Sequence, residues 1–180
     1  MTETSLLKEI APGIVRVAVI FNPKTAPGGG SFFLGPFEPV ARSFAVEPIA
    51  APVTDAAQIE SALAAIWREP GGGLIVMPDA FTTVQRKAII ALAAQHRFPA
   101  IYPYRYEVVD GGLMSYGADN VAMYRQSASY VAKILRGANP ADLPIELPIK
   151  FELAVNLKTA KALNIELPTS ILLRANDVIE

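Results

Sequence analysis

The sequence predicts an α/β fold with three layers, α/β/α, around a parallel flavodoxin-like or Rossmann-like sheet of about five strands. Three observations indicate this fold. Segments typical of strands and of helices alternate from residue 15 to residue 135. The strand segments are short and almost wholly apolar, as strands are when both faces of a parallel sheet are covered. The helix segments carry apolar residues at helical spacing, so each has a face to bury against the sheet.

The expected strands are apolar runs that end at a turn former such as Pro, Asn or Gly. They are predicted at 15–21, 46–53, 74–77, 99–102, 113–116 and 151–155. The second run carries Pro48. Because proline cannot donate a hydrogen bond to a neighbouring strand, this run is expected at the edge of the sheet.

The expected helices are segments with helical periodicity or with cap residues at their ends. They are predicted at 5–11, 32–44, 56–68, 81–96, 104–109, 119–135, 157–163 and 169–175. Gly137 is expected to end the longest of them. Pro36 and Pro39 predict that the helix at 32–44 is broken or starts late, because each proline removes a helical hydrogen bond.

The domain organisation is predicted to be simple, because the chain shows neither a tandem repeat nor a long linker. Residues 1–180 are expected to form a single α/β domain. Within it, 14–137 is the parallel core, and 138–180 holds a crossover, the last strand and the C-terminal helices. The alternative is a domain with a tail from Asn139 that packs elsewhere.

The composition excludes several classes of protein. Apolar residues make up 52% of the chain and charged residues 18%, which is typical of a globular protein. The net charge of −1 and the absence of a basic cluster argue against nucleic-acid binding. The apolar runs are shorter than the roughly 18 residues of a membrane span. With no cysteine, the chain has no disulfide, no catalytic thiol and no thiolate metal site.

A ligand site is predicted at one edge of the sheet, where the carboxyl ends of parallel strands meet. Polar or aromatic residues follow four of the expected strands. The candidate ligand-binding residues are Asn22, Asp79, Thr82, Thr83, Tyr104, Arg105, Tyr116 and Gly117.

For these residues there is a chemical reason to expect ligand binding, and for most of them an alternative structural role. Asp79 suits a ligand ammonium or hydroxyl group, or it caps the helix that follows. Thr82 and Thr83 stand at the start of that helix, where free N–H groups can receive a carboxylate. Tyr104 can stack on a flat ligand and Arg105 can pair with a carboxylate, or both belong to a surface turn.

The remaining candidates are Asn22, which lies in a turn, and Tyr116 and Gly117, which lie at the end of a strand. Asn22 offers both donors and an acceptor, but it also suits the turn before Pro23. Gly117, which follows Tyr116, allows a close approach of the backbone.

Enzymatic chemistry is not expected. His96 is the single histidine, so the chain offers no Ser/His/Asp set and no metal-ligand cluster. The glycines at 28–30 lack the Walker lysine and the dinucleotide-binding spacing. We therefore expect no catalytic residue, no metal and no cofactor.

The longest motifs resemble one known family. RVAVIFNP, GGLIVMPD followed by FTTVQR, and above all YVAKILRGANPADLPIELPIKFELAVNLKTAKALNIELP are similar to the second half of the substrate-binding proteins of ABC importers. The family has the type I periplasmic binding fold, a two-lobed clamp with the solute between the lobes. Some members take up aromatic amino acids.

The resemblance implies that the chain is the C-terminal lobe portion of a solute-binding component. It implies a small-molecule solute such as an amino acid, an ABC permease as partner and a periplasmic location. The first 13 residues do not read as a secretory signal, so the chain as given is expected in the cytoplasm. The loop KTAPGGGSFFLGPF departs from the family pattern.

A lobe alone exposes the surfaces of its cleft, so a homodimer is expected, with exchange of tail segments such as 151–155 as one route. Two other functions remain open at this point. One is a small cytoplasmic flavodoxin-like enzyme that uses Asp79 and Arg105, and the other is a metabolite-sensing module. A neighbouring permease and ATPase gene would favour the importer component over both.

Overall fold

The computed structural model describes residues 2–68 and 70–180, and its strands form one sheet. The strands are β1 (Arg16–Phe21), β2 (Glu47–Pro52), β3 (Gly72–Val76), β4 (Ala100–Tyr102), β5 (Met114–Ala118), β6 (Phe151–Asn156) and β7 (Asp177–Ile179). Their order across the sheet is β2-β1-β3-β4-β5-β6-β7. The five adjacent strands from β2 to β5 all run parallel to one another, which confirms the predicted fold class.

The last two strands extend that core in a way that the sequence did not predict. β6 pairs antiparallel with β5, with Tyr116 opposite Leu153, and β7 pairs parallel with β6. β6 has a neighbour on each side within its own chain, so this strand leaves no open edge in the structure. Exchange of tail segments between two copies stays a prediction.

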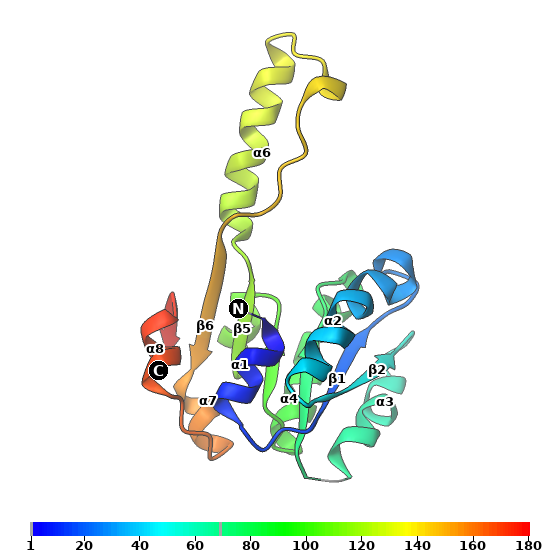
Figure 1. The fold of residues 1–180 in the computed structure, drawn as a ribbon, viewed down its shortest axis with the longest axis vertical. Coiled ribbons are helices and arrows are strands. Elements are labelled where there is room, and N and C mark those ends of the chain that lie inside the picture. The colour runs from blue at the N-terminus through cyan, green and yellow to red at the C-terminus, as the bar shows by residue number, and fades with distance from the viewer. Residues whose placement is uncertain (1, 69) are drawn as a thin grey trace.

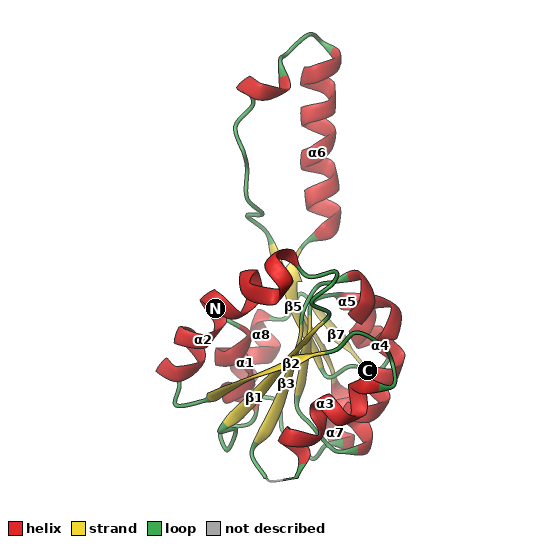
Figure 2. Cartoon of the chain, turned by 90° about the vertical axis from the view of Figure 1, so that its right-hand side faces the viewer, coloured by secondary structure: helices red, strands yellow, loops and turns green. Residues whose placement is uncertain are grey.

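Helices cover both faces of the sheet (Figures 1 and 2). They are α1 (Glu3–Ile10), α2 (Ser31–Ser43), α3 (Gln58–Trp67), α4 (Ala80–Gln95), α5 (Arg105–Val109), α6 (Asn120–Leu135), α7 (Leu157–Ala162) and α8 (Thr169–Arg174), with 3-10 turns at Pro27–Gly30 and Pro140–Asp142. Alternate residues of β1 point to opposite faces: Val17 and Val19 pack on the side of α1 and α2, and Ala18 and Ile20 on the side of α3 and α4.

One helix prediction is wrong in detail. α2 runs without interruption through Pro36 and Pro39. Both prolines lie on the exposed side of the helix. The carbonyl groups that lose their helical partner there can be hydrated instead, so the helix continues.

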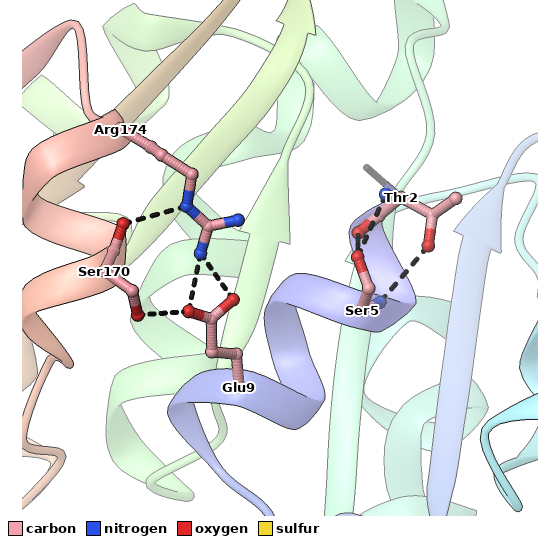
Figure 3. Close-up of polar contacts among 5 residues, drawn as sticks. All are labelled: Thr2, Ser5, Glu9, Ser170 and Arg174. Atoms are coloured by element: carbon pink, nitrogen blue, oxygen red, sulfur yellow. Dashed lines mark hydrogen bonds and ion pairs between the residues drawn. The ribbon is translucent and has the colours of Figure 1, made fainter.

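The first and last helices are tied together beside the sheet (Figure 3). Glu9 of α1 accepts hydrogen bonds from Ser170 and Arg174 of α8. α1 itself begins with a capping box, in which the Thr2 hydroxyl accepts from the Ser5 N–H at 3.2 Å. The Glu9 contacts thus tie α1 to α8 on one face of the sheet.

Residues 119–150 form an arm that projects from the sheet (Figures 1 and 2). The arm consists of α6 and an extended return segment, and none of the α6 side chains is buried. At its base, Asp119 donates its N–H to the Lys150 carbonyl at 2.9 Å, and the two side chains form an ion pair. Among the described residues, no helix, α6 included, is both long enough and apolar enough to cross a bilayer.

Candidate functional site

A cavity of about 290 Å³ opens at the carboxyl ends of the central strands. Its walls come from the ends of β3, β4 and β5, from the base of the arm and from α1. The lining residues are Glu3, Ile75, Val76, Met77, Pro78, Ile101, Tyr102, Pro103, Tyr104, Tyr116, Gly117, Ala118, Asn120, Met123, Pro148 and Phe151. This is the edge where parallel strands place ligands.

Three of the eight candidate residues line this cavity, namely Tyr104, Tyr116 and Gly117. The other five, Asn22, Asp79, Thr82, Thr83 and Arg105, lie outside its wall. Asp79 directly follows the lining residue Pro78 in the chain. Asn22 donates its N–H to the Asp79 carboxylate, so both residues lie next to the cavity wall without being part of it.

Two tyrosines of the cavity wall are each stacked on a second ring. Tyr116 stacks on Phe151 of β6, with centroids 5.7 Å apart and planes 22° apart. Tyr104 stacks on Tyr106, with centroids 5.2 Å apart. Since each pair fixes the orientation of a lining tyrosine, the cavity presents preformed aromatic surfaces to a flat or apolar group.

Gly117 is required by a close approach of two strand ends. A Cβ atom at this position would lie 2.1 Å from the carbonyl oxygen of Pro103. The structure thus confirms that this glycine permits close backbone contact, here between β5 and the loop after β4. Both Pro103 and Gly117 line the cavity.

Asp79 is the N-cap of α4 and is only 7% exposed. Its Oδ1 accepts hydrogen bonds from the N–H groups of Phe81 and Thr82 at 2.8 and 3.0 Å, and from the Thr25 hydroxyl at 3.2 Å. Its Oδ2 accepts from the Asn22 N–H at 3.0 Å. In this state the carboxylate joins the loop after β1 to the start of α4, the capping alternative that the sequence left open.

The two threonines at the start of α4 are engaged locally. The Thr82 side chain is buried, and its hydroxyl donates to the Met77 carbonyl at 2.7 Å. The Thr83 carbonyl accepts a hydrogen bond from the Arg86 guanidinium at 3.1 Å. The Thr82 contact holds the end of β3 against the start of α4.

Arg105 points toward the C-terminal strand. Its Nε donates to Asp177 of β7, and the two side chains form a half-exposed ion pair. The partner is 72 positions away in the sequence, so no local pattern announces it. In the described structure the guanidinium therefore holds α5 against β7.

Glu107 is a residue that the sequence analysis missed. It is fully buried, and its Oε2 accepts from the Tyr104 N–H at 3.0 Å, which caps the short helix α5. Its Oε1 has no hydrogen-bond partner among the described residues. Burial raises the pKa of this carboxyl to about 7, against a smaller lowering by the Tyr104 N–H and Arg86. The spacing Tyr104-x-x-Glu107, a capping box, was the available signal.

The electrostatics of the cavity favour neutral or positively charged ligands. Glu3 is the one acidic residue in the wall, and no lysine, arginine or histidine lines it in the described part of the chain. Burial, and then the nearby Glu3 carboxylate, raise the pKa of Tyr116. Burial, and then Tyr106, raise the pKa of Tyr104. Both phenols thus stay protonated at neutral pH and can donate hydrogen bonds.

The described residues contain no cluster of His, Cys, Asp or Glu that could hold a metal ion.

Comparison with protein families gives a match over nearly the whole chain. The model of the ABC transporter substrate binding protein family matches residues 1–179. The chain belongs to this family. The resemblance stated from the motifs is therefore confirmed, and the family is one of binding proteins rather than of enzymes.

Solved structures share the fold of the chain. A conserved domain protein from Vibrio cholerae is 26% identical, with a TM-score of 0.85. An ABC domain from Streptococcus pneumonia, solved in complex with L-Trp, is 20% identical, with a TM-score of 0.86. CD0873 from Clostridium difficile, a substrate binding protein with adhesive properties in its ligand-free, open form, is 19% identical, with a TM-score of 0.71.

These structures are longer than the chain. They match 97%, 98% and 97% of the chain, which in turn spans 58%, 60% and 58% of their lengths. No curated protein matches the chain. As a member of the ABC substrate-binding family, the chain carries its cavity at the edge of the sheet where ligands of α/β proteins are expected.

Proposed function

We propose that the chain binds a small organic solute in the cavity at the ends of β3, β4 and β5, as part of the solute-binding component of an ABC-type importer. The observation that carries the proposal is the pair of preformed aromatic surfaces, Tyr104 and Tyr116, at the strand ends. A solute with an aromatic or branched apolar side chain fits such walls.

An amino acid is the solute class that we favour. Its ammonium group can approach Glu3, which is the single acidic group of the wall. The L-Trp complex of the Streptococcus pneumonia relative supports this class by analogy. Asn22, Asp79, Thr82, Thr83 and Arg105 stay in the proposal as residues that shape the rim, with solute contact as their further predicted role.

The partners and the location extend the same proposal. An ABC permease would receive the solute, and the periplasm is where the family resemblance puts this step. A homodimer is also proposed, because the arm leaves apolar side chains uncovered on the isolated chain. The protein would have no catalytic activity of its own.

The test is a panel of aromatic and branched L-amino acids, titrated into the chain by isothermal calorimetry. Because the cavity is open on one side, we expect weak binding and a small or absent thermal shift. Tyr116→Ser should abolish the binding that is found, whereas Tyr130→Ser, a matched change on the arm, should leave it unchanged. Equal affinities for the two variants would contradict the proposed site.

A further inference from the structure

The cavity at the strand ends has one charged residue in its wall. Among the described residues that line it, this residue is Glu3, which lies in the first turn of α1. α1 is anchored to the body of the protein, because Leu6 and Leu7 are fully buried in the core and Glu9 pairs with Arg174 of α8. The backbone that carries the Glu3 carboxylate is therefore held at the wall.

Three helices begin beside the cavity, and an acidic side chain of the chain itself occupies each start. Asp79 caps α4 with hydrogen bonds from two backbone N–H groups. Glu107 accepts from the N–H of Tyr104 at the start of α5, and Asp119 accepts from the N–H of Ala122 at 2.9 Å and so caps α6. A ligand carboxylate often binds the N–H groups at a helix start. Here those starts already hold a carboxyl group, so a second one is disfavoured.

The basic residues that adjoin the wall in the chain have partners of their own. Arg105, which follows a lining tyrosine, forms an ion pair with Asp177. Lys150, which precedes the lining residue Phe151, forms an ion pair with Asp119 at 3.1 Å. The polar side chains of the wall other than Glu3 are phenol and amide groups without charge. Because an ionised carboxylate loses much hydration when it is buried, uncharged donors compensate it poorly.

The aromatic rings of the wall favour a cation. The face of a tyrosine ring attracts an ammonium group, and the rings of Tyr104 and Tyr116 both line the cavity. Glu3 lies near one of them, since burial and then the Glu3 carboxylate raise the pKa of Tyr116. An ammonium group at this place would contact a carboxylate and a ring together. The volume of about 290 Å³ suits a small ligand.

We infer that this cavity takes a small primary amine with an aromatic or branched apolar group, and that it binds the ammonium group of the solute rather than a carboxylate. This specificity rests on the proposed function, because the site is the same. The ammonium group lies between Glu3 and the ring of Tyr116. An amino acid keeps these contacts, but its carboxylate has no charged partner among the described residues. The chain should therefore prefer an amine to the amino acid with the same side chain.

Three ligands with the same indole ring separate the effects of the two charges. Tryptamine carries only the ammonium group, indole-3-propionate carries only the carboxylate, and tryptophol is uncharged. In calorimetry at neutral pH and low salt, tryptamine should bind about three- to tenfold more tightly than tryptophol, as a partly exposed ion pair and a cation–ring contact predict. L-Tryptophan should bind more weakly than tryptamine, and indole-3-propionate should not bind at millimolar concentration.

Variants of Glu3 test whether this residue causes the preference. Glu3→Gln should lower the affinity for tryptamine to that for tryptophol and leave the affinity for tryptophol unchanged. Glu3→Lys should reverse the order, so that indole-3-propionate binds more tightly than tryptamine. Glu60→Gln removes an exposed acid on α3 and is the matched control, which should bind all ligands as the unchanged chain does. Loss of a structural role alone would not reverse the order of the ligands.

The outcomes separate this specificity from the proposed solute site. Binding of L-tryptophan that is as tight as that of tryptamine, or tighter, would overturn the specificity and keep the site. A preference for tryptamine that survives Glu3→Gln would overturn the role of Glu3, and the inference with it. Absence of binding by all four indole ligands would contradict both the specificity and the proposed function.

Discussion

The carboxylate of Asp79 accepts a hydrogen bond from the backbone N–H of Asn22 at 3.0 Å, across 57 positions of sequence. The same carboxylate caps α4 through Phe81 and Thr82. One buried side chain thus joins the ends of β1 and β3, which are neighbours in the sheet. The rim of the candidate site depends on this link, even though Asp79 does not itself line the cavity.

Replacing Asp79 with alanine should lower the free energy of unfolding by about 2 kcal/mol, because a helix cap and a buried acceptor for the Asn22 N–H are lost together. The measurement is urea denaturation followed by circular dichroism. Asp142→Ala, an exposed aspartate on the arm, is the matched control and should change stability little. Equal stability of the two variants would contradict the role assigned to Asp79.

The same Asp79→Ala variant tests whether Asp79 also binds the solute, which is the second role that the sequence leaves open. If Asp79 also contacts the solute, the affinity should fall while the fold persists. Calorimetry with the solute that binds best would measure this. Unchanged affinity would leave Asp79 with capping alone.

Gly117→Ala should destabilise the protein by about 2 kcal/mol or more, because the new Cβ atom would lie 2.1 Å from the Pro103 carbonyl oxygen and would force β5 or the β4 loop to move. Gly35→Ala is the matched control. Gly35 lies in α2 with open space around it, so this change should stabilise the protein by about 0.5–1 kcal/mol. Thermal denaturation would measure the change in melting temperature, which should fall for Gly117→Ala and rise for Gly35→Ala. A Gly117→Ala protein as stable as the unchanged chain would disprove the close approach.

Glu107 predicts a pH dependence of stability. Its pKa is about 7 in the folded protein, above the ordinary value of 4.5, because burial disfavours the charged form. Between these two values the folded state binds more protons than the unfolded state, so this residue's contribution to stability is full below pH 4.5 and is lost as the pH rises to about 7. Glu107→Gln should remove this loss.

The test compares the free energy of unfolding of the Glu107→Gln variant and the unchanged chain at pH 4.5, 6 and 8. The difference in favour of glutamine should grow with pH by about 1–3 kcal/mol. A constant difference would mean that Glu107 does not titrate in this range.

The sequence predicted the parallel core well because its strands are buried on both faces. Runs such as 15–21 and 74–77 are apolar throughout, and an interior parallel strand is the structure that such a run suits best. The edge position of β2 followed from Pro48 alone. The division of the chain into a single domain remains a prediction.

Other features depend on contacts that no local pattern encodes. α6 was correctly expected as a long helix, although at 16 residues it only equals α4. Its amphipathic pattern suited a helix on the sheet as well as one on a projecting arm. β7 is three residues long and begins with a charged aspartate, so it carries no strand signal. The ion pair between Arg105 and Asp177 joins residues that are 72 positions apart, so no local pattern predicted it, and solute contact by Arg105 stays a prediction.

The residues of the candidate site were likewise predicted only in part. The rule that parallel strand ends converge was sufficient to bring Tyr104, Tyr116 and Gly117 to one cavity. It was not sufficient to find Phe151, because that residue enters the wall through the antiparallel strand β6. Glu107 was missed because its importance comes from burial rather than from its position at a strand end.

The most direct test of solute binding at the strand ends is the mapping of amide chemical shifts by NMR during titration with L-tryptophan and the other amino acids of the panel. We predict that the shifting amides cluster at the ends of β3, β4 and β5, with Met77, Tyr104 and Gly117 among them. Shifts confined to the groove between α6 and the return segment, or no shifts at millimolar solute, would contradict the account.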